Sequence, residues 1–443
     1  GTAMRRASAS WLLLGLVALV TAGLYSLLLV LSRTPAIQEL IPLTNFFRIA
    51  LVVHVDLSVL IWLLSISGVL WSLASEKELP RWDRFSFWLA AAGTGIVIVS
   101  PFLGAGDPLM NNYVPILQHP VFYTGLSLFA VGISSHLVRS LLFRQKLTQL
   151  DGAAALRFGI AISAFVTVIA FAAFLASLAG IPAGMEGQVY FEFLFWGGGH
   201  ILQFTYTILM IIAWIVLASQ GGCRFVLTPR LTSMLLLFLA LPVLTVPFLY
   251  IAHDVTSSGH RIAFTELMKY GGLSCLPLGL AVLVSLFGAR KAEGEERHLR
   301  SALLASIALF AVGGILGFLI SGLDIVIPAH YHGSTVGVTL AFMGLTYYFL
   351  PRLGYGPVPP RMAYWQPYVY GGGQLLHIIG LAWSGGYGVQ RKTAGAAQGL
   401  DQLGEVAGMG LMGLGGLVSV IGGVLFLVVA WRSIRSTSST TQE

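Results

Sequence analysis

Charged side chains are scarce in this sequence. Only 10% of its 443 residues are Asp, Glu, Lys or Arg, whereas a soluble globular domain has about 25%. Hydrophobic residues make up 56% of the chain, and the mean hydropathy is +0.83. This composition excludes a soluble globular protein and predicts a chain that crosses a membrane many times. The net charge is +7. We expect no nucleic-acid partner, because the basic residues are distributed as expected for the loops of a membrane protein rather than for a nucleic-acid-binding surface.

Cysteine is also scarce. Cys223 and Cys275 lie far apart in the chain, in different segments. They exclude a disulfide framework, a zinc-binding cysteine pattern and a Cys-x-x-Cys-His site for covalent haem. A cysteine pair for a dinuclear copper centre is absent as well.

Long apolar segments recur along the whole chain, and each has the roughly 20 residues that a membrane helix needs. They cover 10–33, 46–74, 84–103, 121–138, 155–180, 189–218, 230–252, 264–289, 301–322, 329–351, 366–385 and 405–431. The sequence therefore predicts an all-α membrane protein with twelve transmembrane helices in one domain, 1–443. The residues before Met4 are typical of a cleaved tag, and we expect the first apolar segment to be a transmembrane helix rather than a signal peptide.

The basic residues predict the orientation of these helices. Clusters at 77–84, 139–157 and 290–300 fall in loops on the same side as both termini. Because cytoplasmic loops are enriched in Lys and Arg, we expect 1–9 and the tail 432–443 to be cytoplasmic.

The histidines gather toward the opposite side of the membrane. With this topology, His200 and His377 lie deeper in their helices, while His136 and His298 are predicted at the cytoplasmic face, solvated. The others lie at or near the outer ends of their segments: His54, His119, His253, His260, His330 and His332. Imidazoles inside a membrane are unfavourable unless something occupies them. This cluster therefore predicts metal or haem ligation.

His330 and His332 are the most informative pair. Residues two apart on a helix point about 200° apart, so the two imidazoles cannot bind one metal together. They can each reach a partner on opposite sides of the helix.

Several motifs resemble the catalytic subunit I of the haem-copper oxidase and nitric oxide reductase superfamily. The matching stretches are Pro328-Ala-His-Tyr-His332 with Leu345-Thr-Tyr-Tyr-Phe-Leu-Pro351, Gln390-Arg-Lys392, and Phe195-Trp-Gly-Gly-Gly-His200. The resemblance covers essentially the whole chain, and it implies a multi-pass respiratory enzyme of the prokaryotic inner membrane.

The resemblance implies two haems, which we expect to be b-type. His54 and His332 would be the axial ligands of a low-spin haem, and His330 would be the proximal ligand of a high-spin haem. Arg391 and Lys392 would contact haem propionates, and so would Arg48, whose guanidinium suits a carboxylate.

The distal metal site departs from the oxidase pattern, in which all three ligands are histidines. His200 matches, but the next expected pair reads His253-Asp254. Two imidazoles and a carboxylate favour iron, whereas an all-imidazole site favours copper. The alternative is that Asp254 is a loop residue and that His260 completes a three-histidine site.

A second departure concerns tyrosine. Oxidases have a tyrosine one turn after the histidine that matches His200, but this chain has Phe204, which cannot supply a proton or an electron. Tyr250 could replace it only if its helix end is favourably turned. The missing tyrosine favours reduction of nitric oxide (NO), and Glu192, two turns before His200, is a candidate proton relay or a structural hydrogen-bonding residue.

The sequence contains no motif that could receive electrons from a soluble carrier. An electron-donating partner subunit of the cupredoxin or cytochrome c type, or a quinol, is therefore implied, besides membrane lipid. The nearest rival function is O₂ reduction by a terminal oxidase of the same superfamily. Two further candidates are a haem-bearing subunit without a distal metal and a twelve-helix transporter, although we find no similarity between the two halves of the chain.

Overall fold

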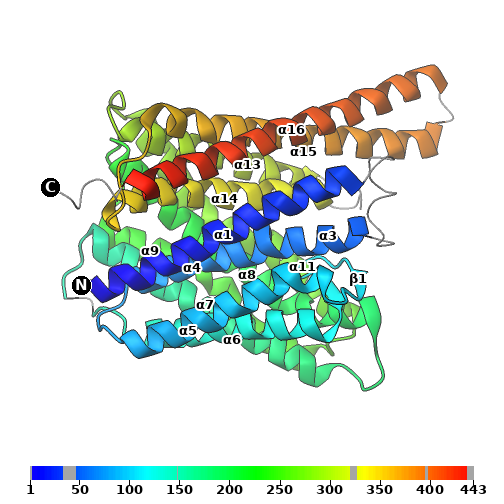
Figure 1. The fold of residues 1–443 in the computed structure, drawn as a ribbon, viewed down its shortest axis with the longest axis horizontal. Helices are drawn as coiled ribbons and strands as arrows, with labels where there is room; N and C mark the ends of the chain where they lie inside the picture. The colour runs from blue at the N-terminus through cyan, green and yellow to red at the C-terminus, as the bar shows by residue number, and fades with distance from the viewer. Residues whose placement is uncertain (1, 33–45, 147, 320–326, 395–397, 437–443) are drawn as a thin grey trace. The chain divides into compact units, whose positions relative to one another are not determined.

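The computed structural model describes residues 2–32, 46–146, 148–319, 327–394 and 398–436. Within these ranges, side chains are not described for 2–5, 30–32, 318–319, 327–331, 384–394 and 398–402. The described residues are almost entirely helical (Figure 1).

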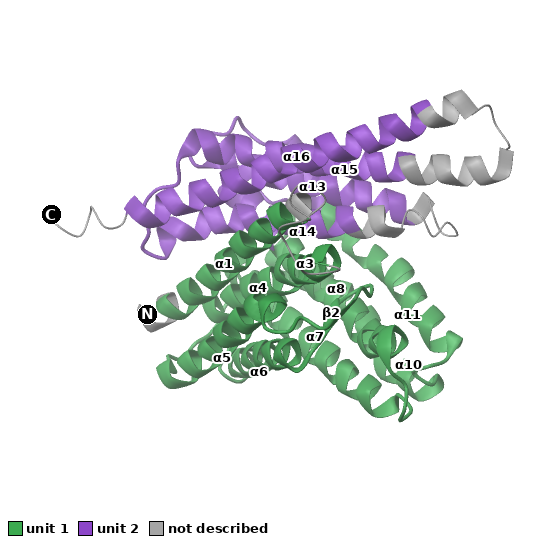
Figure 2. Ribbon diagram, turned by 45° about the vertical axis from the view of Figure 1, so that its right-hand side comes forward, with its two compact units in different colours: residues 1–212, 227–279 green, residues 213–226, 280–443 purple. Residues whose placement is uncertain are grey.

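The chain divides into two compact units, which Figure 2 colours separately. Unit 1 contains residues 1–212 and 227–279, and unit 2 contains 213–226 and 280–443. The helices α8 (Gly187–Gln220) and α12 (Leu276–Phe287) contribute to both units. The expectation of one membrane domain stays a prediction.

Unit 1 consists of helices and one small hairpin. Its elements are α1 (Thr2–Ser32), α3 (Phe46–Val55), the π-helix η1 (Asp56–Ile61), α4 (Trp62–Leu73), α5 (Pro80–Val99), the 3-10 helix η2 (Ser100–Phe102), β1 (Asp107–Leu109), β2 (Ile116–Gln118), α6 (Pro120–Leu142), α7 (Gly152–Gly180), α9 (Pro229–Ala240), the 3-10 helix η3 (Leu241–Thr245), α10 (Val246–Ala252), α11 (Ser258–Gly271) and the 3-10 helix η4 (Gly272–Cys275).

Glycines allow α5 and α6 to pack closely within unit 1. A Cβ atom at Gly93 would come within 2.4 Å of the backbone nitrogen of Phe129. A Cβ at Gly132 would come within 2.5 Å of the backbone nitrogen of Ala90. Such close backbone contact is typical of membrane helices, whose association depends on van der Waals packing rather than on the hydrophobic effect.

Unit 2 contains four long helices besides its parts of α8 and α12: α13 (Glu296–Leu319), α14 (Ile327–Arg352), α15 (Pro360–Ala394) and α16 (Gln398–Ser436). Figure 1 shows α15 and α16 running side by side. Glycines seven residues apart, Gly373 and Gly380 on α15 and Gly415 and Gly422 on α16, contact the facing helix. Their spacing places each pair on one helix face.

Eleven helices in the described residues are long and apolar enough to cross a membrane. They match eleven of the twelve predicted segments, which confirms an all-helical, multi-pass membrane protein. The remaining predicted segment, 366–385, lies in α15, which is not among the eleven. A twelfth crossing and the cytoplasmic location of both termini stay predictions.

The loop between α5 and α6 folds into an antiparallel hairpin. Asp107 pairs with Gln118, and Leu109 pairs with Ile116. Gly106 has a φ angle of 73°, and a Cβ there would lie 2.2 Å from the carbonyl oxygen of Gln118. Glycine is required here because other residues rarely adopt positive φ.

Candidate functional site

The site in unit 1 is organised around His200 on α8. The imidazole is buried, and its Nδ1–H donates to the carbonyl oxygen of Trp196, one turn earlier, at 2.7 Å. This hydrogen bond leaves Nε2 as the nitrogen available for a metal. Donation of the other ring N–H to a carbonyl is the usual arrangement of a metal-ligating histidine.

The three glycines before His200 each accommodate an aromatic side chain from another element. A Cβ at Gly197 would lie 2.3 Å from the hydroxyl of Tyr250, one at Gly198 would lie 2.3 Å from the ring of Phe174, and one at Gly199 would lie 2.2 Å from the ring of Tyr113. The glycine run therefore allows α7, α10 and the β1–β2 loop to approach the helix turn that carries His200.

Tyr113 brings the β1–β2 loop into direct contact with His200. Their ring centroids are 4.9 Å apart in an edge-to-face arrangement. The side chain of Asn111 holds the loop, because its Oδ1 accepts hydrogen bonds from the backbone N–H groups of Tyr113 at 3.0 Å and Val114 at 2.8 Å. The β1–β2 loop is thus part of the site rather than a simple connection.

His260 is the second buried imidazole near this site. It lies in the first turn of α11 and is 1% exposed, with Tyr250 and Phe264 rings each 4.9 Å from its own. In the described part of the chain, neither of its ring nitrogens has a hydrogen-bond partner. Buried polar groups nearly always have a partner, so both nitrogens are available to a ligand.

His253 and Asp254 follow the end of α10. His253 has an extended backbone, with φ −133° and ψ 134°, and it is partly buried. Its Nδ1 lies near Gly259, where a Cβ would come within 2.6 Å. Asp254 is exposed, and its carbonyl oxygen accepts hydrogen bonds from the backbone N–H and the hydroxyl of Ser257.

The described residues do not gather a complete ligand set. No three His, Cys, Asp or Glu side chains among them lie close enough to hold a metal ion. The set of His200, His253 and Asp254 therefore stays a prediction. The burial of His260 makes it a stronger candidate than its position in the sequence alone indicated.

Phe204 and Tyr250 differ in their surroundings. Phe204 is 2% exposed, and its ring reaches α11 at Gly271, where a Cβ would lie 3.2 Å from it. The hydroxyl of Tyr250 lies 2.8 Å from the hydroxyl of Ser177 and donates to the carbonyl oxygen of Ala173 at 3.1 Å. The ring of Tyr250 thus faces the site, while its hydroxyl group forms hydrogen bonds with α7.

His54 lies in the last turn of α3, and its Nδ1 is hydrogen-bonded to a backbone carbonyl, as in His200. Its Nδ1–H donates to the carbonyl oxygen of Ala22 on α1 at 2.7 Å, and the hydroxyl of Ser26 lies 3.1 Å away. Nε2 is again the nitrogen left for a metal. His54 is partly exposed.

In unit 2, His332 lies on α14 beside two polar residues of α15. Its Nε2–H donates to the side-chain oxygen of Gln374 at 2.5 Å, and its ring lies 5.2 Å from that of His377. His377 in turn donates from Nδ1 to the carbonyl oxygen of Met412 at 3.2 Å, which suits a supporting hydrogen-bonding role. Ligation through Nε2 of His332 would require Gln374 to move.

The remaining predicted residues are placed as follows. The backbone of His330 belongs to α14 and those of Arg391 and Lys392 to α15, but their side chains lie outside the described residues. Arg48 is exposed on α3. Glu192 on α8 accepts a hydrogen bond from the side-chain amide of Asn112 at 2.6 Å.

The sequence matches one protein family over nearly its entire length. Residues 6–425 match the family model described as Cytochrome C and Quinol oxidase polypeptide I. The chain belongs to this family.

Three known proteins are similar to this polypeptide I chain. It is 30% identical to an uncharacterized protein of Rickettsia prowazekii, over 96% of this chain and 95% of the relative, and 30% identical to one of Aquifex aeolicus, over 78% and 85%. It is 24% identical to cytochrome c oxidase subunit 1 of Thermus thermophilus, over 88% of this chain and 77% of that protein.

A solved structure shares the fold. A haem-copper terminal oxidase studied by cryo-electron microscopy matches with a TM-score of 0.68 and 17% identity, over 98% of this chain and 84% of that one. The protein is thus a divergent subunit I of the haem-copper oxidase superfamily, and a membrane respiratory oxidoreductase.

The family implies haem and a metal centre, and the imidazoles of His54, His200 and His260 in this polypeptide I chain suit such groups. His54 and His200 each have Nδ1 held by a backbone carbonyl. His260 is buried with two nitrogens that lack partners among the described residues. Neutral imidazole nitrogens are suitable ligands for haem iron, non-haem iron or copper.

Two residues of the polypeptide I chain were missed by sequence reasoning. Asp56, at the start of η1, is 1% exposed, and in the described part of the chain neither carboxylate oxygen has a hydrogen-bond partner. An acidic residue in an otherwise apolar segment, two positions after His54, is the signal that could have identified it. Tyr113 offered no such signal, because only the fold brings its loop to His200.

The prediction that His136 and His298 are solvated was wrong. His136 is 1% exposed, because its Nε2–H donates to the carbonyl oxygen of Gly68 at 2.8 Å and its ring packs on Trp11. His298 is 4% exposed, with its ring 5.9 Å from that of Tyr347. Helix packing within each unit encloses the ring, which hydropathy does not reveal.

Proposed function

We propose that this subunit I reduces nitric oxide to nitrous oxide in a respiratory complex of the prokaryotic inner membrane. Two NO molecules, two electrons and two protons give one N₂O and one water. The observation that carries this proposal is Phe204, a buried phenyl ring one turn after His200. Breaking the O–O bond of O₂ needs four electrons, which this position cannot help to supply, whereas coupling of two NO molecules needs only two.

We assign the expected cofactors to the chain as follows. His54 and His332 would hold the low-spin haem, and His330 would hold the high-spin haem, with both haems expected to be of the b type. Arg48, Arg391 and Lys392 would contact the propionates. A non-haem metal, with iron favoured, would lie on His200, His253 and Asp254.

The haems would supply electron transfer, and the distal metal would supply a Lewis acid that stabilises negative charge on oxygen. The residues of the chain position these groups and deliver protons. The carbonyls of Ala22 and Trp196 orient the rings of His54 and His200. Glu192 lies two turns before His200 on the same helix face and can hold a proton, with Asn112 fixing its carboxylate.

O₂ reduction is the second candidate, and a specific observation favours it. His260 is buried beside the ring of Tyr250, while Asp254 is exposed. A site of His200, His253 and His260 would contain only imidazoles and would favour copper. Tyr250 would then be a phenol beside the site, with its ring 4.9 Å from that of His260.

Metal analysis together with turnover of NO and O₂ separates the two candidates. For NO reduction we expect one non-haem iron per two haems and NO turnover, both lowered by Asp254→Asn because the amide cannot offset the charge of the cation. The control Asp107→Asn changes an exposed carboxylate of the same unit and leaves both unchanged.

One copper per two haems with O₂ turnover would instead establish the second candidate. His260→Gln would then lower metal content while Asp254→Asn retained it. A colourless purified protein would contradict both candidates and favour a transporter.

Electrons must reach the proposed low-spin haem from another molecule, because the chain has no motif for covalent haem or dinuclear copper. We propose a partner subunit of the cupredoxin or cytochrome c type, or a quinol, as the donor. If a quinol reduces the haems of the purified subunit without any second protein, the quinol is the electron donor.

A further inference from the structure

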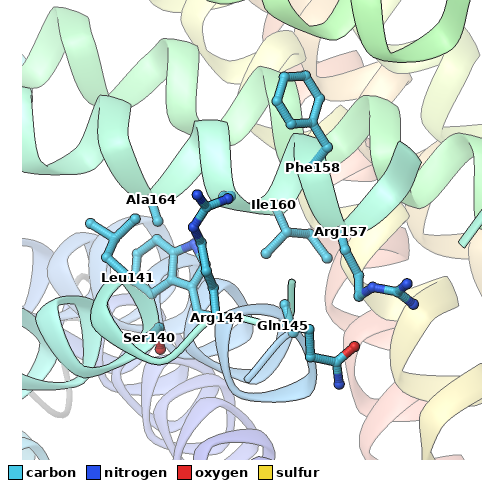
Figure 3. Close-up of a pocket in the computed structure, with 11 residues that line it drawn as sticks. Ser140, Leu141, Arg144, Gln145, Arg157, Phe158, Ile160 and Ala164 are labelled. Carbon is cyan, nitrogen blue, oxygen red and sulfur yellow. The ribbon is translucent and has the colours of Figure 1, made fainter. Parts of the chain in front are cut away.

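A small cavity lies in unit 1 between α4, α6 and α7, at the end predicted to face the cytoplasm. Figure 3 shows it, with Arg144 and Arg157 among the residues around it. The cavity holds about 20 Å³, which is enough for one oxygen-sized group. Ser140, Gln145, Ile160 and Trp71 also line it.

Most polar side chains of this cavity already have partners. Trp71 donates to the hydroxyl of Ser163 at 3.1 Å. The hydroxyl of Ser140 donates to the carbonyl oxygen of His136 at 2.8 Å. The side-chain amide of Gln145 donates to the backbone carbonyl oxygen of Ser75 at 3.2 Å. The donors that remain for a ligand are therefore the two guanidinium groups.

Neither guanidinium is neutralised by the part of the chain that the structure describes. The Nε of Arg157 is buried there without a hydrogen-bond partner. Arg144 is exposed at its end, and the ion pairs among the described residues involve Arg139, Arg290 and Arg352 instead. A buried donor without a partner is rare in proteins, so this Nε indicates a ligand that accepts a hydrogen bond.

The surface next to the cavity is apolar and faces outward. Leu142, at the end of α6, is 64% exposed, and Phe165 on α7 is 52% exposed. Phe165 lies eight residues beyond Arg157, about 12 Å farther along the helix. Arg157 on α7 and Arg144, two residues beyond the end of α6, thus lie on a part of the chain that also presents exposed apolar side chains.

We propose that this cavity binds the phosphate of an anionic phospholipid of the cytoplasmic leaflet. One phosphate oxygen enters the cavity and accepts from Arg157 Nε, while Arg144 contacts the outer oxygens. Guanidinium groups suit phosphate oxygens, and basic pockets between membrane helices on the cytoplasmic side are typical lipid headgroup sites. One acyl chain lies along Leu142 and Phe165.

The test compares the purified full chain with two double variants in detergent. Arg144→Gln/Arg157→Gln removes the cavity donors, and Arg81→Gln/Arg84→Gln removes two exposed charges from α5 on the same predicted side. Thermal unfolding and native mass spectrometry follow binding of phosphatidylglycerol, phosphatidylcholine and inorganic phosphate. We expect phosphatidylglycerol to bind about tenfold more weakly to the cavity variant, and the control variant to bind it as the wild type does.

Three results would overturn the proposal. Equal loss in both double variants would mean that general surface charge attracts the lipid. Equal stabilisation by inorganic phosphate alone would identify a soluble anion as the ligand. Unchanged phosphatidylglycerol binding in the cavity variant would exclude the cavity. If the double variant does not fold, as judged by circular dichroism, the exposed Arg144→Gln alone and the charge-retaining Arg157→Lys provide the same comparison.

Discussion

Replacing Gly199 by alanine tests how the glycine run builds the site. The added Cβ would stand 2.2 Å from Cγ and 2.5 Å from Cδ2 of Tyr113, whereas carbon atoms pack at about 3.5–4.0 Å. The Tyr113 ring must therefore move by roughly 1.3 Å to restore ordinary contact. Since the hydrogen bonds of Asn111 hold this loop, the ring cannot move freely.

The free energy of unfolding should fall in the Gly199→Ala variant. Overpacking of this kind costs about 1–3 kcal/mol, while alanine in a helix gains about 0.5–1 kcal/mol over glycine. The net destabilisation is therefore between about 0 and 2.5 kcal/mol, with a midpoint of roughly 1 kcal/mol. The shift of Tyr113 should also disturb the orientation of His200, whose ring it contacts, and should lower the content of distal metal.

The assay is unfolding in mixed detergent micelles, followed by circular dichroism, with metal analysis of the same samples. Gly95→Ala is the matched control, because this helical glycine has nothing within 4 Å of its added Cβ. It should be neutral or slightly stabilising. In a Tyr113→Ala background, Gly199→Ala should no longer destabilise the protein. The steric reasoning is refuted if Gly199→Ala is as benign as Gly95→Ala, or if the double variant is simply additive.

Two further substitutions test other parts of the molecule. His332→Ala should remove the low-spin haem spectrum and retain the high-spin one. Asp83→Asn should destabilise unit 1 by about 3–5 kcal/mol, because Asp83 pairs with the buried Arg139 at 2.8 Å, whereas Glu295→Gln, in an exposed pair, should cost less than about 1 kcal/mol.

Each of these two predictions has a result that would contradict it. Loss of the high-spin spectrum in the His332 variant would mean that the roles of His330 and His332 are reversed. Equal stability losses in the Asp83 and Glu295 variants would mean that burial does not determine the strength of these pairs.

The helices and the family were accessible from the sequence because both depend on local features. Membrane crossing depends on the length of an apolar segment, so eleven predicted segments match helices in the structure. The motif around His330 and the glycines before His200 indicated the superfamily, because the expected histidine ligands occur at characteristic spacings. The orientation of the chain and the roles of individual ligands stay predictions.

Side-chain environments depended on contacts between distant segments. Hydropathy placed His136 at a solvated face, but packing against Trp11 and Gly68 buries it. Likewise, sequence position favoured Asp254 over His260, but Asp254 is exposed and His260 is buried.

A multi-pass membrane protein of the haem-copper superfamily could be inferred from the sequence, because the length of apolar segments and the spacing of ligands are properties of the chain alone. The groups that surround His200 could be found only in the folded protein. The three glycines before His200 do not reveal their role in the sequence. In the structure, Tyr250, Phe174 and Tyr113 from three other elements occupy the space that side chains at these positions would need.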